Sequence, residues 1–492
     1  MLAPILWSIS FATFYRPTSV AGLLTGDLGT FASPKTGIKW RYWIQDASVS
    51  TDIVRSDIAE IASVGSSGFE LLSYQTYGGT VLLDPTDYAF GSSRFVDVAA
   101  AAVQSAQASG ITVDFAMGPN QGAGVPVEDV DMEGMLTELV FGSYFPSPGE
   151  EFSGPLPNPT IFPDVENNDT PSANITTLAL VSAIVAQLVP GTDPTFFRVS
   201  LDWSTVQDLT SQVDKSLNLS FTAPTPPSVL LAYYSRRNGY PEAEAGFTGS
   251  FPNKPGSWGS FVIDHFSAKG AEVTTKFMEQ YILSQEGIGA VAALPNVGGY
   301  VWEDSMEFWA QLFWTDSFPQ RFLERHGYEI NKTLPVVSTI STGFAPKPSQ
   351  SFDFGTTVES ARFLEDYQDT LTSLYMDYMQ TFKNWSHTFS NQPAYNFHLD
   401  VAASAAVPDA PEIETLAILT VDEARQLSGG VHLGQAAGGT HIMSSEVGAN
   451  FGQASSMRMA DLINDANIQY AGGVNVALLH GFPYSGPTTG CT

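Results

Sequence analysis

Short apolar segments recur along the chain, and segments with helical periodicity separate most of them. Between the first two apolar segments, Val54, Ile58 and Ile61 fall on one face of a helix. The expected strands are residues 40–44, 69–74, 113–117, 299–302, 395–401, 414–419, 439–444 and 474–479. Eight strands that alternate with helices predict a parallel sheet that closes into an α/β fold of the (β/α)8 TIM-barrel type.

Three further segments predict helices that would cover such a barrel. The Ala-rich residues 95–109 end at Gly110, and residues 319–326 end at Gly327. A glycine just after a helical segment is typical of a C-terminal cap. Residues 360–385 predict a long helix whose apolar face is formed by Leu364, Leu371, Leu374, Tyr375 and Tyr378.

Residues 118–259 depart from this alternation because Pro, Gly, Ser, Thr and Asn are frequent there. Local strand signals remain at residues 197–201 and 229–233. We therefore expect a large insertion after the third strand, at about residues 119–258. The remainder of residues 26–492 is expected to form one catalytic barrel, preceded by a signal or N-terminal segment at residues 1–25.

The chain carries a formal net charge of -30, with 51 acidic and 21 basic residues among its 492. So few cations disfavour binding to nucleic acid or to an anionic membrane surface. The single cysteine, Cys491, excludes an intrachain disulfide and a cysteine-based metal site.

Residues 2–15 are apolar and predict the core of a signal peptide, with an N-terminal strand as the alternative. Asn-X-Ser/Thr sites favour a secreted, extracellular glycoprotein. These sites are Asn168, Asn174, Asn218, Asn331 and Asn384. No later apolar segment is long enough, and free enough of Gly, Pro and charge, to span a bilayer.

Two glutamates follow predicted strands: Glu307 comes after residues 299–302, and Glu446 comes after residues 439–444. Barrel enzymes keep their catalytic groups at such strand ends. Two carboxylates that face one cleft are the minimum needed to hydrolyse a glycosidic bond. The alternative for each glutamate is an exposed loop carboxylate.

Several motifs occur in order from about residue 35 to residue 484. Weaker ones are residues 38–43, 55–58, 68–71, 108–118 and 262–266. The strongest are Asp304-Ser305-Met306-Glu307, Asp409-Ala410-Pro411-Glu412-Ile413-Glu414 and Ser444-Ser445-Glu446-Val447, followed by Leu479-His480. In this order the chain resembles the α-L-rhamnosidases of glycoside hydrolase family 106.

The chain departs from the family's pattern at two points. Met306 stands where the family usually has an aromatic residue, and the β-sandwich part that the family carries beyond its barrel is missing. The resemblance therefore predicts a fungal-type, secreted member that is truncated after the barrel.

The resemblance implies an inverting α-L-rhamnosidase that acts on plant cell-wall polysaccharide or on rhamnosides. It places the catalytic pair on Glu307 and Glu446, and an inverting pair lies roughly 6.5–9.5 Å apart. We assign Glu307 as the acid, because Trp302 and Trp309 would desolvate it and raise its pKa. Glu446 is then the base, and the reverse assignment remains open.

We further expect Asp304, Trp302, His480 and His265 to bind the carbohydrate substrate. The family is associated with calcium that engages sugar hydroxyls, and the resemblance assigns this ion to Glu412 and Glu414. The alternatives are a salt-bridged acidic turn, structural histidines and a tryptophan that fills the core. Two other functions remain open: a non-catalytic carbohydrate-binding barrel, and a glycosidase of different sugar specificity.

Overall fold

The computed structural model describes residues 37–73, 85–88, 90–119, 124–161, 178–239, 257–306, 308, 310–340, 348–355, 357–386, 388–391, 399–416, 420–436, 442–450 and 456–487. The predicted signal segment lies outside these residues. So do the predicted acid Glu307, its neighbour Trp309, and the sites Asn168 and Asn174.

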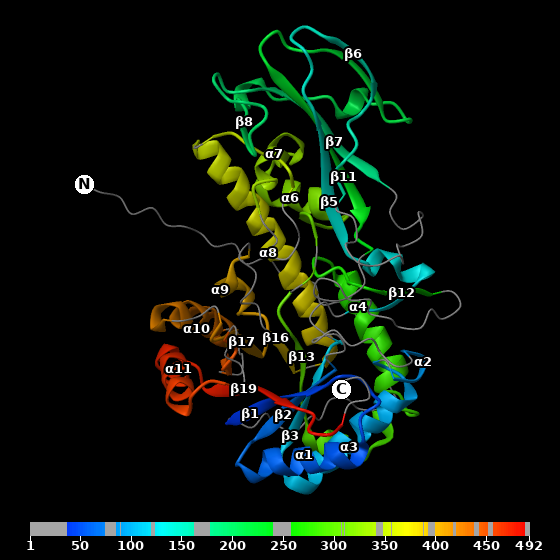
Figure 1. The fold of residues 1–492 in the computed structure, drawn as a ribbon, viewed down its shortest axis with the longest axis vertical. Helices are drawn as coiled ribbons and strands as arrows, with labels where there is room; N and C mark the ends of the chain where they lie inside the picture. Colours follow the sequence, from blue (N-terminus) through cyan, green and yellow to red (C-terminus); the bar gives the residue numbers. More distant parts are fainter. Residues whose placement is uncertain are drawn as a thin grey trace, which may run out of the picture.

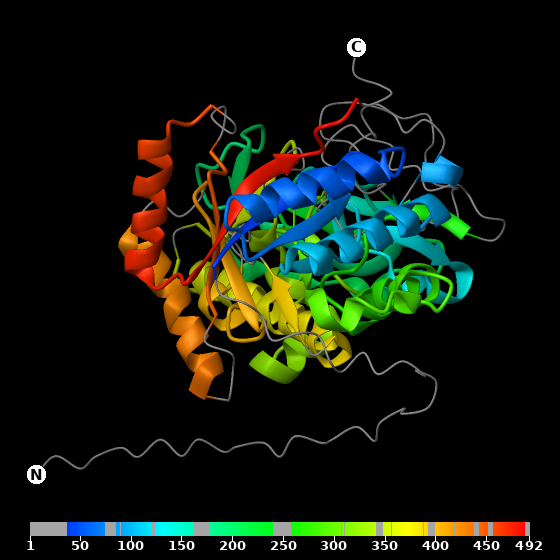
Figure 2. The ribbon, with the colours of Figure 1, turned by 90° about the horizontal axis from the view of Figure 1, so that it is seen from below.

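Within the described residues, eight parallel strands close into a barrel (Figures 1 and 2). In chain order they are β1 (Ile38–Ile44), β2 (Gly68–Ser73), β3 (Thr112–Ala116), β13 (Gly298–Glu303), β16 (Phe389–Asn391), β17 (Ala410–Glu414), β18 (Ser444–Val447) and β19 (Val476–Pro483). The last strand pairs in parallel with the first, which completes the barrel. The predicted (β/α)8 fold is confirmed.

Helices follow most of these strands, as the apolar pattern predicts. They include α1 (Thr51–Ser63), α3 (Ser93–Ser109), α4 (Ala268–Phe277), α6 (Phe318–His326), α8 (Val358–Ser386), α9 (Val401–Ser404), α10 (Val421–Ala436) and α11 (Met459–Gly472). Gly110 and Gly327 end α3 and α6 in the left-handed conformation, with φ of 69° and 76°. In the described ranges, none of the helices combines the length and the apolar character that a membrane span requires.

Three of the predicted strands are placed wrongly. The fifth strand is β16 rather than residues 395–401, and the described end of that segment begins α9. The sixth and seventh strands are β17 and β18, which meet the predicted segments 414–419 and 439–444 only at Glu414 and Ser444. The strands β17 and β18 carry buried carboxylates such as Glu412 and Glu446, which interrupt the apolar pattern. The neighbouring segments are more continuously apolar, so the prediction placed the strands there.

Residues between β3 and β13 form most of a second sheet. It lies at the end of the long helix α8 that is farther from the barrel (Figure 1). It is antiparallel, in the order β14, β5, β11, β7, β9. These strands are β5 (Thr137–Tyr144), β7 (Ala179–Gln187), β9 (Gln207–Asp208), β11 (Ser228–Arg237) and β14 (Phe313–Trp314). The strand β14 follows β13 in the chain, whereas the other four strands precede it. Segments from before and after the barrel strand β13 therefore pair in this sheet.

Both faces of the second sheet are buried, as alternation along β11 shows. Leu231 and Tyr233 belong to the large apolar cluster that continues into the barrel. Ala232 and Tyr234 face the other way, into a smaller cluster beneath the strands β6 (Glu151–Pro155) and β10 (Asn218–Thr222). The insertion is therefore joined to the barrel by a continuous core.

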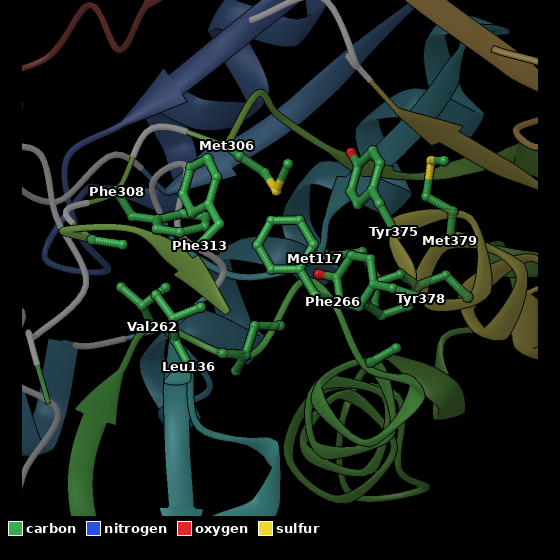
Figure 3. Packing of buried hydrophobic residues seen from close by; sticks show 14 of the residues in the cluster. Met117, Leu136, Val262, Phe266, Met306, Phe308, Phe313, Tyr375, Tyr378 and Met379 are labelled. Atoms are coloured by element: carbon green, nitrogen blue, oxygen red, sulfur yellow. The ribbon is translucent and has the colours of Figure 1, made fainter. Parts of the chain in front are cut away.

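Aromatic and sulfur-containing side chains fill the junction between the barrel, the insertion and α8 (Figure 3). Met117 follows β3, Phe266 precedes α4, and Tyr375 and Tyr378 project from α8. All four are buried. This packing surrounds the end of β13, where the predicted catalytic segment begins.

Inside the barrel, Asp114 of β3 binds two other strands, the adjacent β13 and the more distant β1. It pairs with Lys39 of β1 and accepts a hydrogen bond from the backbone N–H of Tyr300 at 2.8 Å. Its carboxylate lies against Gly299, where an added Cβ atom would meet Asp114 Oδ1 at 2.0 Å. A side chain at position 299 therefore cannot coexist with this arrangement.

We expect Gly299→Ala to lower the free energy of unfolding by roughly 1–3 kcal/mol, because the methyl group overpacks the barrel interior. Gly154→Ala is the matched control, since a Cβ atom there meets nothing within 4 Å. It should change the stability by no more than about 0.5 kcal/mol. Urea denaturation of the two variants measures the difference, and equal losses would contradict the prediction.

Candidate active site

The guanidinium of Arg41 lies inside the barrel and contacts carboxylates that converge on it from four directions. Its Nε donates to Glu70 Oε2 at 3.0 Å, and its Nη2 donates to Glu412 Oε1 at 2.7 Å. Its Nη1 donates to Glu446 Oε1 at 2.5 Å and lies 3.7 Å from Asp304 Oδ1. The strands β2, β17 and β18, and the residue after β13, thus each present a carboxylate to β1.

The buried charged groups of this cluster change one another's pKa values. Burial would lower the pKa of Arg41, but the four carboxylates outweigh it and hold that pKa well above the ordinary value. Burial raises the pKa of Glu412 to about 8 and that of Asp304 to about 6, although Arg41 opposes both shifts. It also raises the pKa of Glu70 well above the ordinary value. Burial therefore favours the protonated forms of Glu412, Asp304 and Glu70, whereas the charge of Arg41 favours their ionised forms.

Trp302 closes one side of the cluster. The Cζ atom of Arg41 lies 4.1 Å from the centre of the Trp302 ring, which is a favourable cation–π geometry. The ring is fully buried and packs with Leu72 and Ala116, while Trp43 is partly buried against the same group. The predicted sugar-stacking residue is thus part of the barrel interior.

His480 lies closer to solvent than the carboxylate it contacts. Its Nδ1 is hydrogen-bonded to Glu446 Oε1, the same oxygen that accepts from Arg41. The His480 side chain is 22% exposed, whereas that of Glu446 is 4% exposed. Its ring meets Trp43 edge-on at 4.5 Å between centroids. His480 is therefore the more exposed partner of this pair, and it lies beside the partly buried Trp43.

Five of the predicted site residues are brought together around Arg41. They are Glu446, Asp304, Glu412, Trp302 and His480. Glu414 is buried in β17, where its Cα pairs with that of Glu446 in the strand register. The predicted acid Glu307 lies outside the described residues.

His265 lies away from this cluster, on the outer side of β13. Its Nδ1 is 2.9 Å from the carbonyl oxygen of Ile263, and its Nε2 is 3.5 Å from Glu303 Oε1. The ring is fully buried between Phe308 and Tyr378, at 4.7 and 5.0 Å between centroids. Burial lowers the pKa of His265 to about 4, so the ring is neutral at neutral pH.

The sequence-based predictions missed Arg41 and Glu70. A signal for Arg41 was present, because Lys39 and Arg41 occupy alternate positions of the first strand. Residues two apart in a strand face the same side, and neither face of a barrel strand is normally exposed. Two cations on one face therefore indicate carboxylate partners inside the barrel.

The donor set does not fit the calcium ion that the resemblance implies. The Glu412 carboxylate is already bound by Arg41, and burial favours its protonated form. In the described part of the chain, no group of three or more His, Cys, Asp or Glu side chains could hold a metal ion. Calcium binding stays a prediction, which metal analysis and activity with and without a chelator would test.

Comparisons with known proteins support the barrel but do not identify a family. No protein-family model matches the chain, and no curated protein sequence matches it. It is similar to the solved structure of a rhamnosidase from Novosphingobium sp. PP1Y, with a TM-score of 0.55 and 14% sequence identity. The similarity covers 91% of this chain and 55% of the other, so the chain spans about half the length of that enzyme. At this identity the likeness shows a rhamnosidase-like fold.

We expect Arg41→Met to lower the free energy of unfolding by about 3–5 kcal/mol at neutral pH, because buried carboxylates lose their cation. The loss should shrink as the pH falls, because protonation of those carboxylates removes their repulsion. The matched control is Arg55→Met, since Arg55 forms an exposed ion pair with Asp52. This control should cost no more than about 1 kcal/mol. Denaturant titrations at several pH values test both, and similar costs for the two variants would contradict the prediction.

A second expectation concerns Glu303, whose pKa burial raises from 4.5 to about 8, against hydrogen bonds from Tyr378 and Asn391. The folded state then binds a proton that the unfolded state releases. The stability due to this group is full below about pH 4.5 and is lost as the pH rises through about 8. Glu303→Gln should therefore flatten the fall in melting temperature between pH 5 and 8. The exposed Glu60→Gln serves as the control, and an unchanged slope in Glu303→Gln would count against the prediction.

Proposed function

We propose that this protein is a secreted glycoside hydrolase that releases α-L-rhamnose from plant cell-wall polysaccharide or from rhamnosides. The observation that carries the proposal is Glu446 in β18 of a closed (β/α)8 barrel, bound by Arg41 and His480. The choice of sugar is supported by the similarity to the solved structure of a rhamnosidase. The Asn-X-Ser/Thr sites and the apolar start of the chain support secretion.

The surroundings of Glu446 suit a catalytic base. A cation at hydrogen-bond distance stabilises the charged form of a carboxylate, which is the form that accepts a proton. Arg41 and His480 both bind Oε1, so two side chains fix the orientation of the carboxylate. In the proposed reaction Glu446 takes a proton from water as the water oxygen bonds to the anomeric carbon.

The partner acid in this proposal is Glu307, three residues after Asp304 in the same strand-end motif. It donates its proton to the glycosidic oxygen as the bond from that oxygen to the anomeric carbon breaks. The product sugar then has the inverted configuration. In this proposal Asp304, which faces Arg41 together with Glu446, accepts hydrogen bonds from sugar hydroxyls.

A non-catalytic carbohydrate-binding barrel is the second candidate. It is favoured by the burial of Glu446, whose side chain is 4% exposed and is held by Arg41 and His480. Turnover of an aryl α-L-rhamnoside separates the two functions. A panel of other aryl glycosides tests the third possibility, a glycosidase of different sugar specificity.

We expect Glu446→Gln and Glu307→Gln each to lower turnover by about 10²-fold or more, because the amide keeps the shape but removes the proton chemistry. An activated aryl leaving group needs little protonation, so it should partly restore Glu307→Gln and not Glu446→Gln. Steady-state kinetics with two leaving groups measure this. The opposite pattern would exchange the two roles, and near-normal turnover in both variants would remove the assignment.

A further inference from the structure

Glu303, the last residue of β13, is bound by groups from three other parts of the fold. The hydroxyl of Tyr378 in α8 donates to its Oε1, and Nδ2 of Asn391 in β16 donates to its Oε2 at 2.9 Å. His265 Nε2, from the segment before α4, lies 3.5 Å from Oε1. The Glu303 side chain is 2% exposed and points away from the Arg41 cluster.

A proton on Glu303 or on His265 would make the contact between Glu303 Oε1 and His265 Nε2 favourable. His265 Nδ1 faces a backbone carbonyl and so carries the hydrogen, which leaves Nε2 as an acceptor in the neutral ring. Burial disfavours the charged forms of both residues. A neutral Glu303 has one O–H, and His265 Nε2 is the acceptor within reach. Asn391 is itself held in place, because the Tyr375 hydroxyl donates to its Oδ1 at 2.9 Å.

The residues just before His265 are hydrogen-bonded to the insertion. The backbone N–H of Asp264 donates to Gly134, and Leu136 donates to Val262, at 2.8 and 2.9 Å. Asp264 Oδ2 also accepts from the Thr315 hydroxyl at 2.6 Å, directly after β14. Phe308 packs against the ring of His265, and Phe266 packs against Phe313 in the aromatic junction of Figure 3.

On the other side of Glu303 the chain enters the proposed catalytic segment. Asp304, its direct neighbour, faces Arg41 Nη1. The backbone that connects these two side chains is therefore held from outside the barrel by Glu303 and from inside by Asp304. A shift of the outer contacts moves Asp304 relative to Arg41 and Glu446.

We propose that Glu303 is a positioning residue, which bridges His265, Tyr378 and Asn391 and thereby fixes the strand end that carries Asp304 and the proposed acid. This inference rests on the proposed function. Glu303 takes no part in proton transfer to the substrate. Its contribution is to the geometry of the reacting groups, and it makes the fit between the insertion and the barrel a determinant of turnover.

Substitution by Gln tests the proposal directly. An amide nitrogen at the position of Oε1 can donate to His265 Nε2, and the amide oxygen at the position of Oε2 can accept from Asn391 Nδ2. Glu303→Gln should keep kcat within about twofold of the wild type. Glu303→Leu should lower kcat by about 10-fold or more with little change in KM, since small misplacement of reacting groups is costly. A catalytic carboxylate would respond in the opposite way, with Gln as damaging as Leu.

A milder substitution tests the proposal even if Glu303→Leu does not fold. Tyr378→Phe removes one donor to Glu303 and should lower kcat several-fold with an unchanged KM. Tyr367→Phe is its matched control, because Tyr367 is also buried in α8 and its hydroxyl donates to the Phe313 carbonyl. This control should leave kcat unchanged. Equal effects of the two would show a general packing defect and overturn the proposal.

Hydrogen exchange tests the positioning role without relying on turnover, so it can fail or succeed independently of the proposed function. Backbone amides of residues 300–306 should exchange faster in Tyr378→Phe than in Tyr367→Phe, whether or not the protein hydrolyses any sugar. A wild type with no turnover of aryl glycosides would remove the proposed function. An active wild type with an inactive Glu303→Gln, or with unchanged exchange and kcat in Tyr378→Phe, would remove the positioning role.

Discussion

Burial of the Arg41 guanidinium is the constraint on which the barrel interior depends. Removing an ion from water costs several kcal/mol, and only close, well-oriented counter-charges offset that cost. Arg41 obtains them from β2, β17, β18 and the residue after β13. These strands present their carboxylates to one point only when the sheet is closed in the observed register. The charge cluster and the barrel thus require each other, and Glu446 acquires Arg41 and His480 as neighbours in consequence.

The outer layers hold the same strands by a different kind of interaction. Outside the barrel the packing is apolar and continuous, from α1 and α3 through the junction of Figure 3 to the second sheet. Glu303 is a polar exception in this layer, and it lies one residue from Asp304, which belongs to the inner cluster. The end of β13 is therefore the place where the polar interior, the aromatic junction and the insertion meet. The long helix α8 contacts both ends of this arrangement and links the second sheet to the barrel.

The sequence predicted the barrel well because helical periodicity and glycine caps are local signals, as in α3 with Gly110. It misplaced β16, β17 and β18 because inward-facing polar residues interrupt the apolar pattern there. The convergence of Asp304, Glu446 and His480 was predictable from their positions at strand ends. For Arg41 the sequence indicates only that carboxylate partners lie inside the barrel. Which carboxylates these are was not predictable, because they are far away in sequence and only the closed barrel brings them together. His265 illustrates the same limit, since its contact with Glu303 depends on how the insertion returns to the barrel.

The contact between Asp114 and Gly299 also has an evolutionary consequence. Asp114 binds Lys39 and the backbone of Tyr300, and it occupies the space that a side chain at position 299 would need. Selection cannot act on these positions independently. In related chains a lysine in the first strand, an aspartate in the third and a glycine in the fourth should be gained and lost as a set. Such covariation would trace this barrel among sequences too divergent for overall similarity to reveal, without reference to any catalytic residue.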